Sequence, residues 1–148
     1  MDAAGLRVAV VVSRFNEFIT GELAKGAFEV LAKHGCEERN ITVVKVPGAW
    51  ELAIAAQALA PQNDAIVALG AVVRGETPHF EYVAAAAAEG LREVSLNTGV
   101  PIAFGVLTTD DLQQAMDRAG GKSGNKGADA AEAAIEMANL LKQVKAAH

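Results

Sequence analysis

The sequence is poor in cysteine and in basic residues, and it has no long apolar run. Cys36 is the only cysteine among 148 residues, so no internal disulfide can form, which suits a reducing cytosol. The formal net charge of -5 argues against nonspecific binding to nucleic acid. The apolar run near the amino terminus is too short for a secretory signal, and no run approaches a membrane span. We therefore expect a cytoplasmic protein with no nucleic-acid partner and no membrane partner.

The patterns that are present alternate between strand and helix. Apolar residues make up 51% of the chain, enough for the core of one domain over residues 1–148, with residues 1–5 as a short flexible start. Apolar, often valine-rich segments predict four strands, over residues 6–12, 41–46, 65–73 and 101–107. Apolar residues at three- and four-residue spacing, with stop signals such as Gly35 and Pro61, predict intervening helices that include 49–60, 77–98, a short one after Thr109 and 127–144.

Strands joined by helices of this length form right-handed parallel βαβ units. The sequence therefore predicts an α/β fold, namely a flavodoxin-like three-layer α/β/α sandwich with a mainly parallel four-stranded sheet.

The segment 70–80, GAVVRGETPHF, combines the features of a ligand site. It leaves the third predicted strand at its carboxyl end, where ligands bind in open α/β sheets. Thr77 is placed to be an N-cap with Pro78 at the first helical position, and free N–H groups there attract phosphate. His79 lies in the first turn, where the dipole disfavours a charged imidazolium, so the neutral ring can accept a proton. The alternative is that His79 is an ordinary surface residue.

Other predicted strands carry further candidate groups. Phe15 and Asn16 follow the first strand, where they could stack on a flat heterocycle and bond its edge, or else pack in the core and cap a helix. Trp50 and Glu51 follow the second strand, and Glu51 could bind a polyol or simply stabilise the helix dipole. Phe104, on the fourth strand, is typical of a core residue when taken alone.

The glycine-rich segment 118–127, RAGGKSGNKG, is basic. Arg118 and Lys126 make it a candidate phosphate clamp on a flexible loop, and a solvated connector is the alternative. It is not a P-loop, because Met116 stands where that motif needs its first glycine. No Rossmann glycine pattern follows the first strand, and no His/Cys/Asp cluster has the spacing of metal ligands. We therefore expect no metal and no cofactor.

The order of these motifs is more specific than any one of them. RFN, PGAWE, GAVVRGETPHFEYV, FGVLTTD and RAGGKSGNKGADAA together resemble the lumazine synthase family, from Leu6 to Leu141. That family catalyses the penultimate step of riboflavin biosynthesis. It joins 5-amino-6-ribitylamino-uracil to 3,4-dihydroxy-2-butanone 4-phosphate, which gives 6,7-dimethyl-8-ribityllumazine with loss of phosphate and water.

The resemblance implies a role for each motif. Phe15 would stack on the pyrimidine, whose polar edges would meet Asn16 and the backbone of Ala71, Val72 and Val73. The ribityl chain would be held by Trp50 and Glu51, in the turn that also contains Gly48 and Ala49.

The same resemblance implies which residues bind the phosphate and which residue transfers protons. Gly75, Glu76 and Thr77 would cradle the phosphate, with Arg118 as its cationic partner, and His79 would shuttle protons. Lys126 and Asp129 match a pair of loop residues near the substrates. Phe104, Arg118 and Lys126 would come from a neighbouring subunit, so the site needs a homo-oligomer.

The resemblance also implies an assembly, namely a pentamer that in many members builds an icosahedral shell, with riboflavin synthase as a further partner. Only residues 1–5 precede the first strand, so we expect the edge strand that this segment adds in the family to be short or absent. Decameric members are one alternative. A flavin- or lumazine-binding module and a shell-forming homologue, both without catalysis, are two others.

Overall fold

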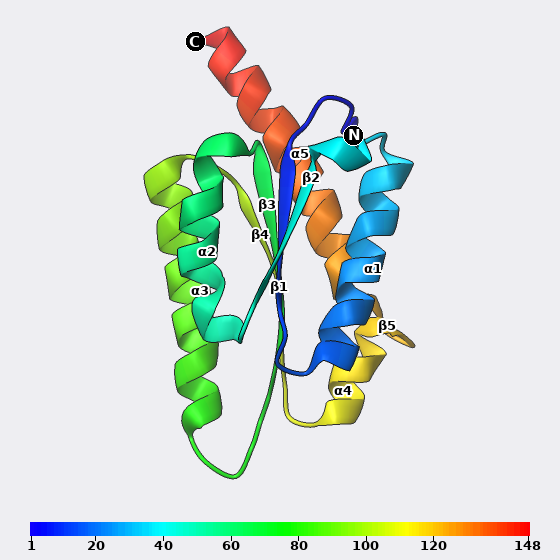
Figure 1. Ribbon diagram of the computed structural model, residues 1–148, viewed down its shortest axis with the longest axis vertical. Coiled ribbons are helices and arrows are strands. Elements are labelled where there is room, and N and C mark those ends of the chain that lie inside the picture. Colours follow the sequence, from blue (N-terminus) through cyan, green and yellow to red (C-terminus); the bar gives the residue numbers. More distant parts are fainter.

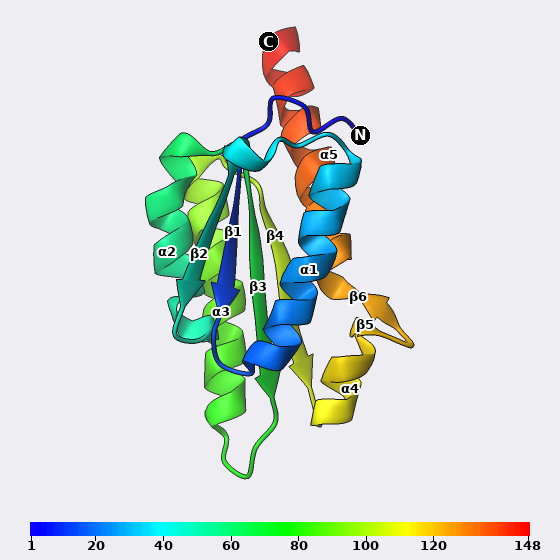
Figure 2. The same ribbon diagram turned by 45° about the vertical axis from the view of Figure 1, so that its right-hand side comes forward.

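In the computed structural model, which describes residues 1–148, four parallel strands form one sheet between two layers of helices (Figures 1 and 2). The strands are β1 (Val8–Ser13), β2 (Ile41–Val46), β3 (Ala65–Val73) and β4 (Ile102–Thr109). Their order across the sheet is β2-β1-β3-β4, and every neighbouring pair is parallel. The predicted α/β/α sandwich with a four-stranded parallel sheet is confirmed.

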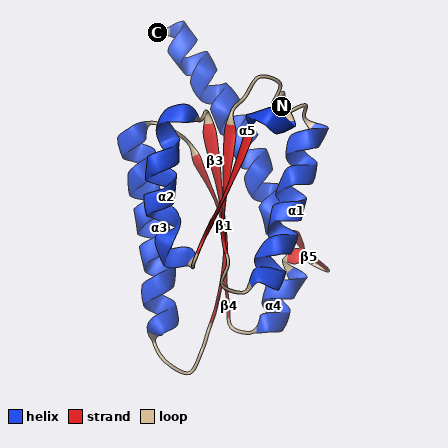
Figure 3. Ribbon diagram, viewed as in Figure 1, coloured by secondary structure: helices blue, strands red, loops and turns tan.

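Helices cover both faces of the sheet (Figure 3). The helices α2 and α3 lie on one face, and α1, α4 and α5 lie on the other. None of them has the length and apolarity needed to cross a membrane. Their bounds are α1 (Glu17–Lys33), α2 (Leu52–Leu59), α3 (His79–Thr98), α4 (Leu112–Asp117) and α5 (Lys126–Ala147), with short 3-10 turns η1 (Glu38–Asn40), η2 (Ala49–Glu51) and η3 (Ala60–Gln62).

The two central strands are buried on both faces, which explains their unbroken apolar sequence. In β1, Val8 and Val10 pack in a cluster with α1 and α5. Ala9 and Val11, which point the other way, pack with α2 and α3. Because β1 and β3 are fixed between two cores, the loops that leave their carboxyl ends start from rigid positions.

The start of α3 differs from the prediction. The helix begins at His79, Pro78 occupies the cap position, and no side chain caps the helix. Thr77 is therefore not the N-cap. The first bond of this turn runs from the Glu81 N–H to the Pro78 carbonyl, so the chain turns one residue later than expected.

The segment 118–127 is a hairpin and not the flexible loop that the sequence suggests. Antiparallel strands β5 (Ala119–Gly121) and β6 (Gly124–Asn125) form it. Gly120 and Gly124 have φ values of +96° and +85°, which glycine adopts without strain. The Asn125 side chain donates to the Glu22 carbonyl oxygen of α1 (3.0 Å) and accepts from the Ala128 N–H (3.0 Å). These contacts fix the hairpin against α1 and α5.

Residues 1–5, which we expect to be a short flexible start, make tertiary contacts at Asp2 and Ala3. Ala3 is fully buried, and its N–H donates to the His34 carbonyl oxygen (2.8 Å). The Asn139 side chain donates to the carbonyl oxygen of Asp2 (3.0 Å). This segment therefore contacts the C-terminal end of α1 and the second half of α5.

The packing of α1 on α5 predicts a strong effect of one methyl group. A Cβ added at Gly127 would overlap the Leu23 carbonyl group of α1. Because backbone and not a flexible side chain would have to move, Gly127→Ala should cost about 3 kcal/mol. For a chain of this size that lowers the unfolding midpoint by roughly 10 °C.

Gly21→Ala is the matched control, because nothing lies within 4 Å of its added Cβ. Helix propensity alone should make that variant about 0.5–1 kcal/mol more stable. Equal midpoints for the two variants would contradict this account of the helix crossing.

Candidate functional site

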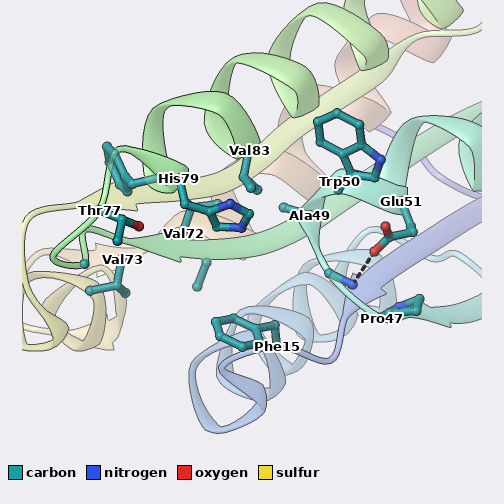
Figure 4. Close-up of a pocket in the computed structure, with 14 residues that line it drawn as sticks. Phe15, Pro47, Ala49, Trp50, Glu51, Val72, Val73, Thr77, His79 and Val83 are labelled. Carbon is teal, nitrogen blue, oxygen red and sulfur yellow. Dashed lines mark hydrogen bonds between the residues drawn. The ribbon is translucent and has the colours of Figure 1, made fainter.

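A cleft of about 530 Å³ opens beyond the carboxyl ends of β1, β2 and β3, beside α3 (Figure 4). We call it the main cleft. Three segments that are distant in sequence line it, and they include most of the predicted site residues: Phe15; Gly48, Ala49, Trp50 and Glu51; and Ala71, Val72, Val73, Gly75, Thr77 and His79.

Two of the aromatic side chains that line the main cleft are strongly exposed. Phe15 is 70% exposed and Trp50 is 61% exposed. The alternative that Phe15 packs in the core is therefore wrong. Figure 4 shows the two rings apart, with Ala49 and Glu51 in the region between them. Flat, exposed rings at a largely apolar cleft suit the stacking of a heterocycle.

Asn16 makes a contact that neither sequence interpretation predicted. It is the only non-glycine residue with a positive φ (61°), a left-handed conformation that asparagine tolerates. Its side chain does not cap α1, although it occupies the cap position. Its amide instead donates to the Ala71 carbonyl oxygen (3.0 Å), and Asn16 does not line the main cleft. Asn16 thus ties the turn after β1 to β3.

Glu51 has one carboxylate oxygen engaged and the other available. Its Oε1 accepts a hydrogen bond from the Gly48 N–H (2.9 Å), the dashed line in Figure 4. That bond closes the turn between β2 and α2. A carboxylate accepts several hydrogen bonds, so Glu51 can still bind hydroxyl groups in the cleft.

The loop between β3 and α3 presents free hydrogen-bond donors. The N–H groups of Gly75, Glu76, Thr77, His79 and Phe80 make no hydrogen bond within the protein. They gather at the N-terminus of a 20-residue helix, where the dipole adds partial positive charge. This arrangement suits an anion such as phosphate. Glu76 belongs to the loop, but its side chain does not line the cleft.

His79 belongs to the same turn and is directed toward the cleft (Figure 4). It is exposed, and it makes no hydrogen bond to another protein side chain. An imidazole in this position can exchange protons with a bound molecule and with water.

The remaining predicted residues lie in a second cleft of about 440 Å³, which we call the β4 cleft. It lies between the edge strand β4 and the hairpin, and its lining includes Phe104, Arg118, Lys126 and Asp129. Phe104 is 39% exposed, so its interpretation as a core residue is wrong. Arg118 and Lys126 are exposed and form no ion pair, although Arg118 Nη1 donates to the Gln114 carbonyl oxygen (3.0 Å). The β4 cleft thus holds cations that are free to bind an anion.

The chemistry of the two clefts is complementary. No lysine or arginine lines the main cleft, which has the free N–H groups and the histidine. The β4 cleft has the two cations and lacks a histidine. Within one chain, the anion site and its cations are therefore separate.

Sequence reasoning missed several lining residues. Pro47, Phe80 and Val83 line the main cleft, and Val106, Leu107, Thr108, Thr109 and Ser123 line the β4 cleft. Helical spacing could have found Val83, which lies four residues after His79 on α3. Nothing in the sequence distinguishes the β4 residues from ordinary strand residues.

Cys36 lies apart from both clefts, near the start of β1. Its Sγ is 3.6 Å from the Leu6 carbonyl oxygen. Burial, and then the neighbouring charge of Glu37, raise the pKa of the Cys36 thiol. A thiol that stays neutral is a poor nucleophile, so Cys36 is a packing residue.

Comparison with known proteins identifies the family. Residues 5–142 match the family model of 6,7-dimethyl-8-ribityllumazine synthase. The chain is 50% identical over 145 residues to the 6,7-dimethyl-8-ribityllumazine synthase of Nitratidesulfovibrio vulgaris (strain DSM 19637 / Miyazaki F), a match that covers 97% of this chain and 93% of the relative. The chain therefore belongs to the 6,7-dimethyl-8-ribityllumazine synthase family, the transferases of riboflavin biosynthesis that its motifs resemble.

Proposed function

We propose that the protein condenses 5-amino-6-ribitylamino-uracil with 3,4-dihydroxy-2-butanone 4-phosphate to form 6,7-dimethyl-8-ribityllumazine, and that it releases phosphate and water. The observation that carries this proposal is the main cleft, where exposed aromatic rings, a free carboxylate oxygen, unpaired N–H groups and a histidine meet. The two substrates together offer a heterocycle, a polyol, a phosphate and groups that gain and lose protons. Each finds a matching group in the cleft.

The proposed roles follow the chemistry of each side chain. Phe15 stacks on the pyrimidine, and the backbone of residues 71–73 meets its polar edge. Trp50 and Glu51 hold the ribityl chain, with Glu51 Oε2 as an acceptor. The N–H groups of residues 75–77 bind the phosphate, and His79 carries protons during imine formation and phosphate elimination. The Asn16 amide is bonded to the Ala71 carbonyl group, and its side-chain oxygen remains an acceptor for the polar edge of the pyrimidine.

The rate of the reaction depends mainly on how the two substrates are positioned relative to each other. An amine held against a ketone in the correct orientation can react faster by an amount worth on the order of 7 kcal/mol or more. A positioned proton carrier adds about 10²–10⁴-fold. The protein groups in the main cleft either position the substrates or, in the case of His79, carry protons.

We further propose that each site is completed by a neighbouring subunit, in a pentamer of which larger icosahedral shells can be built. The main cleft has no cation for its phosphate, and Arg118 and Lys126 in the β4 cleft of the next copy supply one. Phe104 of that copy covers one side of the site, and Asp129 lies beside Lys126. Exposed apolar side chains on α3 support an assembly, since Tyr82 is 70% and Leu96 is 68% exposed. Light scattering distinguishes a pentamer, a decamer and a shell by their mass. Riboflavin synthase is a proposed partner of the assembly.

Incubation with both substrates tests the function. We expect the absorbance of the lumazine chromophore to appear together with one inorganic phosphate per product. The control is 3,4-dihydroxy-2-butanone, which should react far more slowly, because hydroxide, a poorer leaving group, would have to depart in place of phosphate and the N–H groups of the loop would have no anion to bind. A protein that binds lumazine or flavin but releases no phosphate would instead be the non-catalytic binding module.

A further inference from the structure

Arg74 connects three segments at the edge of the main cleft, although it lines neither cleft. It is the first residue after β3. Its N–H donates to the Thr109 carbonyl oxygen at the end of β4 (2.9 Å), and its Nε donates to Asp110 Oδ1 (3.0 Å). Its guanidinium carbon lies 4.7 Å from the centre of the Phe80 ring, and its Nη1 lies 4.0 Å from Glu81 Oε1.

The partners of Arg74 are placed where they control the anion site. Phe80 and Glu81 immediately follow His79 in the first turn of α3. Asp110 is itself held, because its N–H donates to the Gln114 side chain (2.9 Å) at the start of α4. One guanidinium therefore fastens the first turn of α3 to the end of β4.

The loop that bears the phosphate donors has little else to hold it. The N–H groups of residues 75–77 make no hydrogen bond within the protein, so they cannot fix the loop themselves. Each Arg74 contact is modest alone, since the side chains are about half exposed or more. They act together because one planar group makes them all, which a lysine ammonium cannot do.

We propose that Arg74 is a positioning residue, which sets the geometry of the Gly75–Thr77 donors and of His79 by clamping α3 to Asp110. This inference rests on the proposed function for the identity of the phosphate that these donors bind. A misplacement of about 1 Å can reduce rate by about 10²-fold, so a clamp remote from the reacting atoms is able to matter.

The test separates geometry from charge with Arg74→Ala, Arg74→Lys and Asp110→Ala. For Arg74→Ala we expect KM for the butanone phosphate to rise about tenfold, equivalent to roughly 1.4 kcal/mol, with little change in KM for the pyrimidine substrate. Arg74→Lys keeps the charge and should be impaired similarly. Asp110→Ala removes a negative charge and should nevertheless weaken phosphate binding. Arg39→Ala, which breaks an exposed pair with Glu37 (2.8 Å) away from the clefts, should leave the kinetics unchanged.

Binding of inorganic phosphate, followed by the NMR shift of the His79 ring, keeps this test independent of turnover. If the wild-type protein forms no lumazine but the Arg74 and Asp110 variants bind phosphate more weakly, the proposed function fails and the clamp stands. If Arg74→Lys matches the wild type, or Asp110→Ala binds phosphate more tightly, the effect is one of charge and the clamp is wrong. Unchanged binding and KM in all three variants would also overturn it.

Discussion

Replacing His79 by alanine is expected to lower kcat by about 10²–10⁴-fold, the range of a lost proton carrier, without abolishing turnover. The cleft would still hold the amine against the ketone, so the positioning part of the acceleration remains. His79 is exposed and bonds no other side chain, so the variant should fold normally. KM values should change little, because the phosphate donors near His79 are backbone groups.

Steady-state kinetics with both substrates measures this effect. His148→Ala is the control, because that residue is an exposed histidine at the end of α5. The assignment of His79 as the proton carrier would have to be abandoned if kcat of His79→Ala stayed within about twofold of the wild type, since that leaves no proton-transfer contribution to explain.

Replacing Arg118 by alanine should raise KM for the butanone phosphate by roughly 10–100-fold, because hydrogen bonds between charged groups contribute about 1.5–3 kcal/mol. The pyrimidine substrate should be affected far less. Lys122→Ala is a demanding control: it removes a cation of the same hairpin, but one that pairs with Asp117 (3.7 Å) and does not line the β4 cleft. Equal KM values for the two variants would mean that Arg118 contributes only general positive charge.

The sequence predicted the fold well because its signals are local. The apolar segments of β2 and β3 have the predicted bounds. The segment that contains His79 lies at the cleft because it directly follows a central strand, and ligand sites lie at such strand ends.

The errors arose where contacts between distant segments decide the structure. The segment 118–127 reads as a loop, yet it is a hairpin held by the bond from Asn125 to Glu22 on α1. The bond from the Asn16 amide to the Ala71 carbonyl oxygen, made by a residue in a left-handed conformation, was likewise not predicted. The separation of Arg118 from His79 within one chain, which only the family resemblance implied, follows from the strand order, since β4 is an edge strand. No local pattern contains that information.

Mixed oligomers test most directly our proposal that each site is shared between two subunits. His79→Ala disables the main cleft, and Arg118→Ala disables the β4 cleft. Co-expressed in equal amounts, with an affinity tag on one variant to isolate mixed assemblies, they should yield about one quarter of sites with both halves intact, because each site draws its halves from neighbouring copies. We predict that activity at low butanone phosphate recovers to about that fraction of the wild type, well above the sum of the separate variants. Activity no greater than that sum would show that each chain builds its site alone.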